Sequence, residues 1–158
     1  MDIETTDNVL ERVVLAELDG LDFVSSYTTA EIAAAFNGIG PSFLSDAQRK
    51  KLSKYLALFM PAALIHDMRY EVSDLSRHGF NYANIEFRDN CYKLANHAYG
   101  ILNWRRYRAW FVAELLFAGV ASDYGWQAWC DAARAATGGR DKARPSQADN
   151  AGNGERTT

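Results

Sequence analysis

Apolar residues recur every three or four positions along most of this chain, and this spacing constrains the fold more than any other feature. Val9, Val13, Val14 and Leu18 follow it near the start. The spacing is that of one face of an α-helix. No segment carries a strong strand pattern, so the sequence predicts an all-α fold. A small hairpin at Ser76–Tyr82 is an alternative for that segment alone.

Capping residues, glycines and prolines divide the periodic pattern into separate helices. Thr28 or Thr29 precedes a run that stops at Asn37-Gly38. Pro61 suits the first turn of a new helix, where its missing N–H costs nothing. The predicted helices lie around Val9–Leu18, at Thr29–Asn37, at Asp46–Phe59, from Pro61 to about Ser73, at about Tyr82–Tyr99, from Asn103 to about Ser122, and in a short segment after Gly125.

Length and composition indicate one folded domain with a polar tail. The chain has 158 residues, and 48% of them are hydrophobic, which is enough to build a core. The segment from Thr137 onward has no large apolar residue. We therefore expect a helical domain over residues 1–136 and a disordered tail over 137–158. Cys91 and Cys130 are single and far apart, which favours buried free thiols over a disulfide framework or a metal site.

Charge and targeting signals narrow the classes of protein further. The net charge of −3 at pH 7 argues against a general nucleic-acid binder. The opening "MDIETTDNVLER" lacks both the basic and the apolar region of a signal peptide. The longest apolar stretch, Tyr55–Ile65, is interrupted by Pro61 and is too short to span a bilayer. We expect a cytoplasmic product, which another system could carry elsewhere.

The stretch "PAALIHDMRY" places three chemically useful side chains close together. On a helix, His66 and Tyr70 are four residues apart and share a face. Asp67 is rotated from His66 by about 100°, so it can point to the adjacent side. The histidine can then hold a water as a general base while the carboxylate of Asp67 binds a cation nearby.

The stretch "FNGIGPSF" at Phe36–Phe43 offers a partner for that carboxylate. Calcium takes six to eight oxygen ligands, which one carboxylate does not supply. Glycine at alternate positions allows a loop to bend its carbonyls around one point. The sequence therefore predicts that this loop is one half of a cation site and that Asp67 is the other half.

An aromatic-x-Gly-x-Gly loop followed by a helix bearing His-Asp-x-x-Tyr resembles the phospholipase A2 superfamily, and most closely its small prokaryotic and phage-type members. The resemblance covers roughly residues 36–121. It implies a small helical domain in which two antiparallel helices hold the site. It also implies Ca2+ as the cofactor and a phospholipid as the substrate.

The resemblance assigns a role to each matching residue. His66 would activate a water, and Tyr70 would supply a supporting hydroxyl. The Gly38 amide would help to hold the oxyanion. The implied calcium ligands are the carboxylate of Asp67 and the carbonyls of Phe36, Gly38 and Gly40.

The second helix departs from the pattern of the family. Secreted members are rich in disulfides, and this chain is not. The prokaryotic branch has an aspartate about three residues before an aromatic residue, and here Asn84 before Phe87 or Asp89 before Tyr92 could match it. Asn84 lies on the mostly apolar face of its helix, whereas Asp89 lies on a mixed face about 140° away. The apolar face should meet the His66 helix, so we expect Asn84 to orient His66. An asparagine cannot stabilise an imidazolium as a carboxylate does.

Two functions follow as hypotheses. The first is calcium-dependent hydrolysis of a phospholipid acyl ester by a water that His66 activates. The second is a catalytically weak or inactive binding or interaction protein, of phage or bacterial origin, on the same scaffold. His78 and His97 have no comparable neighbours and are expected at the surface. The histidine spacing fits no zinc pattern, and three histidines leave little for a His-Asp phosphohydrolase.

The stretch "NWRRYRAWF" interleaves three arginines with aromatic residues. It is typical of a surface helix whose arginines are solvated and whose aromatic residues pack inward. The alternative is a basic, aromatic patch that meets anionic head groups, which would give a peripheral membrane contact. The following "FVAELLFAGVA" is too short to span a bilayer and favours a core helix.

Overall fold

A computed structural model describes residues 3–36, 45, 47 and 56–142 of the chain. Helices make up the secondary structure of this part, which confirms the predicted all-α fold. The elements are α1 (Ile3–Leu15), α2 (Leu21–Val24), α3 (Thr29–Ala35), the short 3-10 helix η1 (Ala57–Phe59), α5 (Met60–Glu71), α6 (Arg77–Ala98), α7 (Trp104–Val120) and α8 (Asp123–Lys142).

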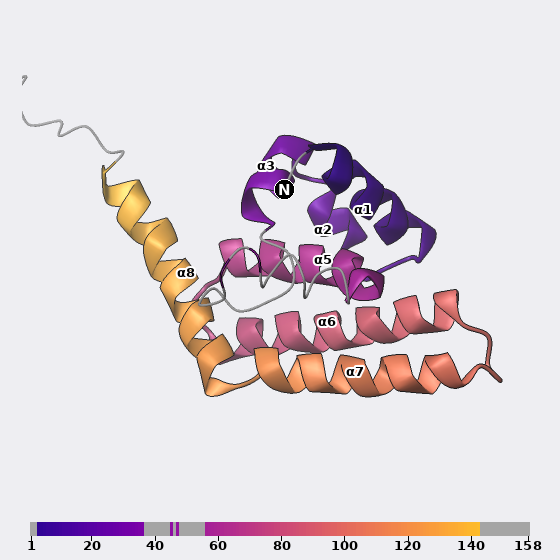
Figure 1. The fold of residues 1–158 in the computed structure, drawn as a ribbon. Coiled ribbons are helices and arrows are strands. Elements are labelled where there is room, and N and C mark those ends of the chain that lie inside the picture. Colours follow the sequence, from indigo (N-terminus) through magenta and orange to yellow (C-terminus); the bar gives the residue numbers. More distant parts are fainter. Residues whose placement is uncertain (1–2, 37–44, 46, 48–55, 143–158) are drawn as a thin grey trace, which may run out of the picture.

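The helices form layers around α5 (Figure 1). Helices α1, α2 and α3 lie on one side of α5, and α6 lies on the other. Helix α6 runs antiparallel to α5 after a short turn, and α7 runs back along the outer side of α6. Helix α8 turns away from the end of α7 and packs against α5. Because α5 has neighbours on several sides, it is the central element of the fold.

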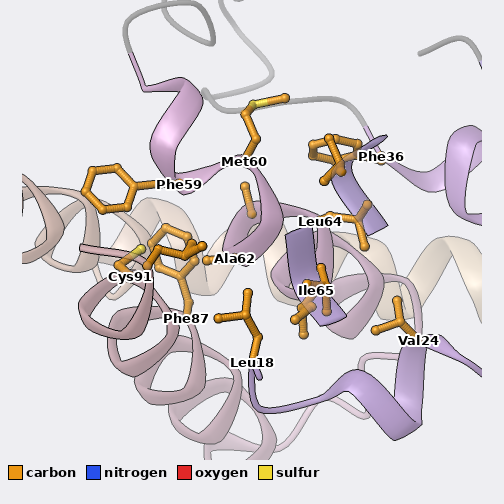
Figure 2. Packing of buried hydrophobic residues seen from close by; sticks show 14 of the residues in the cluster. Leu18, Val24, Phe36, Phe59, Met60, Ala62, Leu64, Ile65, Phe87 and Cys91 are labelled. Carbon is orange, nitrogen blue, oxygen red and sulfur yellow. The ribbon is translucent and has the colours of Figure 1, made fainter. Parts of the chain in front are cut away.

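The core is centred on α5, as its burial shows. Every residue from Met60 to Met68 except Asp67 is buried. Figure 2 shows Leu64 of α5 near Phe36 and Ala62 near Phe87 of α6. Pro61 occupies the first turn of α5, as predicted. The first half of α5 is apolar all round, and such a segment is stable only when it is covered on most sides.

Local capping confirms one predicted helix start and corrects another. Thr28 caps α3 in a reciprocal capping box with Glu31. Helix α6, however, begins at Arg77, five residues before the predicted start at Tyr82, because the Ser76 hydroxyl accepts a hydrogen bond from the Gly79 N–H. The hairpin considered for Ser76–Tyr82 is therefore wrong.

Helix α8 is longer than the short segment predicted after Gly125. It runs from Asp123 to Lys142 and so continues past Thr137, where the sequence predicts the start of the tail. Alanines at 132, 133, 135 and 136 precede that point, and alanine has the highest helix propensity. The rest of the expected tail, 143–158, lies outside the described residues.

Helix α7 also differs from the expectation of a core helix with inward-facing aromatic residues. Ala109 and Ala113 are buried against the rest of the fold. Trp104 and Tyr107, in contrast, are 64% and 52% exposed. The inward packing predicted for these two aromatic residues is wrong, because α6 covers only one face of α7.

Three further expectations concern cysteines, histidines and membrane spans. Cys91 and Cys130 are free and buried, as predicted, and burial raises the pKa of the Cys91 thiol. His78 and His97 are exposed, as predicted. Among the described residues, no helix is long and apolar enough to cross a bilayer.

Candidate functional site

Helices α5 and α6 bring His66 and Asn84 into direct contact. The imidazole Nε2 of His66 lies 2.9 Å from Oδ1 of Asn84. Both residues are buried, His66 to 7% exposure and Asn84 to 1%. The predicted apolar face of α6 does meet α5, because Phe87, Cys91 and Leu94 are buried along it. Helical phase therefore predicted the partner of His66 correctly.

The alternative partner, Asp89, points elsewhere. Its carboxylate accepts hydrogen bonds from the neighbouring Arg88 at 3.0 and 3.1 Å. The Asp89 side chain is 45% exposed. The group that contacts the imidazole is thus a neutral amide, and the carboxylate on the same helix is solvated.

The contact with Asn84 sets the tautomer of His66. A carbonyl oxygen accepts hydrogen bonds and cannot donate them, so a neutral imidazole beside Asn84 Oδ1 carries its proton on Nε2. Its lone pair is then on Nδ1. When a hydrogen bond at one ring nitrogen fixes the tautomer, the other ring nitrogen can accept a proton. A general base requires this arrangement.

The free nitrogen of His66 faces the next residue in the chain. Nδ1 lies 3.8 Å from Oδ1 of Asp67, which is longer than a hydrogen bond. The Asp67 side chain is 26% exposed, so it reaches the edge of the buried cluster. This places an imidazole and a carboxylate side by side, as the sequence predicts.

Tyr70 completes the cluster from one turn further along α5. Its hydroxyl lies 3.5 Å from both Asn84 Oδ1 and the Gly125 carbonyl oxygen and can donate its one proton to either. Its ring lies 4.5 Å from the His66 ring, centroid to centroid. Burial is the main cause that raises the pKa of the Tyr70 hydroxyl. The hydroxyl therefore stays a donor at any pH near neutral.

Helix α8 contributes a side of this cluster that the sequence reasoning missed. Trp129 packs edge-on against Tyr70 at 5.1 Å between ring centroids, and the Trp129 carbonyl accepts a hydrogen bond from Ser73 Oγ at 2.9 Å. A Cβ on Gly125 would lie 1.8 Å from the Val120 carbonyl oxygen. Only glycine allows α8 to begin so close to α7. The sequence feature that could have indicated this contact is the pair of tryptophans in "GWQAW".

The proposed calcium loop is only partly described. Phe36 ends α3 with extended backbone, φ −78° and ψ 108°, and its side chain is 1% exposed in the core. Gly38 and Gly40, together with the Gly38 amide expected at the oxyanion, lie outside the described residues. Within the described part, no group of three or more His, Cys, Asp or Glu side chains is placed to hold a metal ion.

The donor set predicted from the sequence, one carboxylate with main-chain carbonyls, would fit calcium better than a transition metal. Asp67 supplies a hard carboxylate oxygen at a partly exposed position. The remaining ligands would be main-chain carbonyls, which calcium accepts and zinc rarely uses. The calcium ligands named from the sequence, Asp67, Phe36, Gly38 and Gly40, stay a prediction.

A second polar pair joins the same two helices one turn away. Arg69 donates two hydrogen bonds of 2.9 Å to the carboxylate of Glu86. The Tyr82 hydroxyl donates to the same carboxylate at 3.2 Å. The guanidinium of Arg69 lies 3.9 Å from the centre of the Phe23 ring. This pair raises the pKa of Arg69, chiefly through the hydrogen bonds to Glu86.

Comparison with family models, with curated proteins and with solved structures finds no match to this chain.

Proposed function

We propose that this chain is a calcium-dependent, phospholipase A2-like hydrolase that cleaves an acyl ester of a phospholipid. The observation that carries the proposal is the 2.9 Å contact between His66 Nε2 and Asn84 Oδ1. It directs the lone pair of the imidazole to Nδ1, which lies 3.8 Å from the Asp67 carboxylate. A base beside a hard oxygen ligand is what metal-assisted ester hydrolysis needs.

His66 would move one proton in each half of the reaction. In the first half, Nδ1 accepts a proton from water as the water oxygen attacks the ester carbonyl carbon. In the second, the tetrahedral intermediate collapses, the ester C–O bond breaks, and Nδ1 returns the proton to the departing alcohol oxygen. The products are a fatty acid and a lysophospholipid. Asn84 holds Nε2–H throughout and keeps the ring in one orientation.

Calcium would be held by Asp67 together with the carbonyls of Phe36, Gly38 and Gly40. When bound, the ion supplies positive charge that offsets the substrate phosphate and the developing oxyanion. Tyr70 acts on Asn84 rather than on the substrate, because its hydroxyl points at Oδ1 of that residue. It is therefore a positioning residue.

The neutral amide of Asn84 favours the second candidate function, a weakly active or inactive binding protein. Replacing the carboxylate behind a catalytic histidine by its amide lowers kcat about 10⁴-fold in a serine protease. The same loss here would leave the scaffold able to bind a phospholipid but slow to cleave it. Asn84→Asp separates the two candidates. A binding protein with an otherwise intact site gains activity on this change, whereas an enzyme adapted to the amide does not.

A hydrolysis assay tests the proposal directly. Wild type is incubated with phospholipid vesicles in calcium and in chelator, beside His66→Ala and the matched control His97→Ala at an exposed histidine. We expect fatty-acid release by wild type and His97→Ala in calcium only. His66→Ala should be at least 100-fold slower, roughly the contribution of general-base catalysis. Equal rates for the two histidine variants would remove His66 from the mechanism.

A further inference from the structure

Helix α7 has a second apolar face that no described part of the fold covers. Its members are Trp104, Tyr107, Phe111 and Leu115, which are 64%, 52%, 64% and 58% exposed. We call them the α7 face. At these spacings of three, four and four residues, the side chains project from one side of a helix. They lie opposite Ala109 and Ala113, which are buried towards α6.

The α6–α7 connection extends this surface beyond the start of the helix. Ile101 and Leu102 are 67% and 96% exposed. With the α7 face they account for six of the thirteen exposed large hydrophobic side chains in the described part of the chain. Single exposed apolar residues are normal, but a contiguous set marks an interaction surface. Figure 1 shows α7 as the outer layer of the helical stack, on the side away from α5.

The charges around this surface indicate what covers it. Arg105 and Arg108 are exposed beside the α7 face, and the Arg108 guanidinium lies 6.0 Å from the centre of the Trp104 ring. Residues 101–120 carry three arginines and one glutamate, a net charge of +2, in a chain whose net charge is −3. The Glu114 carboxylate accepts a hydrogen bond from Tyr92. An anionic partner would offset the positive charge of Arg105 and Arg108.

We propose that the α7 face, together with Ile101 and Leu102, docks on an anionic phospholipid membrane. Tryptophan and tyrosine favour the level of the head groups, and arginine pairs with lipid phosphate. Leu102 and Phe111 would enter the boundary of the acyl chains, as the apolar face of an interfacial helix does. A second copy of the chain is the alternative occupant, which the oligomeric state of the lipid-free chain tests.

This surface is separate from the His66 cluster, so the inference does not depend on the proposed function. His66 lies on α5, whereas α7 is on the far side of α6 (Figure 1). His66→Ala should bind vesicles as the wild type does. A result of no hydrolysis would therefore not count against membrane docking. A result of no docking would not count against hydrolysis, which can be measured with a monomeric short-chain substrate.

Vesicle co-sedimentation of the full chain tests the proposal. The probes are vesicles of phosphatidylcholine alone and of phosphatidylcholine mixed with phosphatidylglycerol. We expect binding to the mixed vesicles that weakens with added salt. Arg105→Gln and Arg108→Gln should each lower the partition coefficient about fivefold. The matched control is Arg134→Gln, at an exposed arginine on α8, which should bind like the wild type.

An apolar pair of variants tests the other half of the surface. Leu115→Ser should lower binding about tenfold, the scale of losing a buried leucine side chain. Leu15→Ser on α1 is the control, because Leu15 is 61% exposed and Leu115 is 58% exposed. Circular dichroism checks that the variants fold. As a second readout, Trp104 fluorescence should shift to shorter wavelength on mixed vesicles in the wild type and not in Trp104→Phe.

Three results would overturn the inference. One is equal binding to neutral and mixed vesicles, or no binding to either. Another is an equal effect of Leu15→Ser and Leu115→Ser. The third is a stable dimer of the lipid-free chain in sedimentation velocity that Leu115→Ser dissociates, because the α7 face would then serve self-association.

Discussion

Two polar pairs join α5 to α6, and they differ in how completely their hydrogen-bonding groups are satisfied. In the Arg69–Glu86 pair, both carboxylate oxygens accept from the guanidinium, and Tyr82 adds a third donor. In the His66–Asn84 pair, Nδ2 of Asn84 is buried and has no hydrogen-bond partner within the described residues. We call the first pair closed because both oxygens of its buried carboxylate are paired, and the second open because its buried amide keeps an unused donor.

This difference separates a structural role from a functional one. A buried carboxylate whose two oxygens are both paired can fix the register of two helices. A buried amide with an unused donor costs free energy. Groups of this kind are tolerated where they bind or react. The contrast predicts that the Arg69–Glu86 pair governs stability and the His66–Asn84 pair governs function.

The largest expected effect comes from breaking the closed pair. Arg69→Met keeps an apolar stem against Phe23 but leaves Glu86, whose side chain is 4% exposed, without its cation. We expect unfolding to become easier by about 3–5 kcal/mol, measured by urea denaturation.

Arg88→Met is the matched control for this variant. The Arg88–Asp89 pair has the same chemistry but lies at the surface, with side chains 32% and 45% exposed. Its removal should change stability by less than about 1 kcal/mol. Similar losses in the two variants would contradict the distinction between a closed, buried pair and a solvated one.

Calcium should stabilise the chain through the His66 end of the interface. At a calcium concentration one hundred times Kd, binding to the folded state adds about 2.7 kcal/mol. Differential scanning calorimetry with calcium or chelator measures the shift. Asp67→Asn should abolish it, whereas Asp89→Asn on α6 should retain it. A wild-type melting temperature that is the same in calcium and in chelator would count against the proposed ligand set.

Replacing the open pair by apolar residues should cost little stability. In His66→Leu/Asn84→Leu, both hydrogen-bonding partners are removed together, so neither is left unsatisfied. We expect stability within about 1 kcal/mol of the wild type, together with loss of hydrolysis. A loss as large as that of Arg69→Met would show that the pair is structural.

The smallest effect concerns the tyrosine that supports Asn84. Burial raises the pKa of Tyr70 above its ordinary value of 10.0, so the folded state keeps this proton when the unfolded state has lost it. The resulting stability is complete below pH 10 and declines as the pH rises further. Tyr70→Phe should therefore flatten the decline of stability above pH 10, measured by urea denaturation across that range. If stability declines with pH as steeply in Tyr70→Phe as in the wild type, Tyr70 does not cause the decline.

The sequence predicted the centre of the molecule better than its ends. The period of α6 identified Asn84 as the partner of His66, because a buried helix face fixes rotation about the helix axis. The Pro61 start of α5 followed from backbone chemistry alone. These predictions succeeded because they depend on local rules that apply at every turn of a helix.

Other features depend on tertiary packing and could not be read locally. The contribution of α8 arises from the close approach of Gly125 to Val120, and no periodicity reports such a contact. The exposure of Trp104 and Tyr107 depends on which face of α7 meets α6. The pattern around them is apolar on both faces, so it could not show which face would be covered.

The central claim is that Asn84 holds His66 with its proton on Nε2 and its lone pair on Nδ1. Long-range proton–nitrogen correlation spectra report the protonation of each ring nitrogen in solution, and His66→Gln assigns the signal among three histidines. In the neutral imidazole, we predict a protonated Nε2 and an unprotonated Nδ1, with the preference lost in Asn84→Ala. A proton on Nδ1 would contradict the account, because no base would then face Asp67.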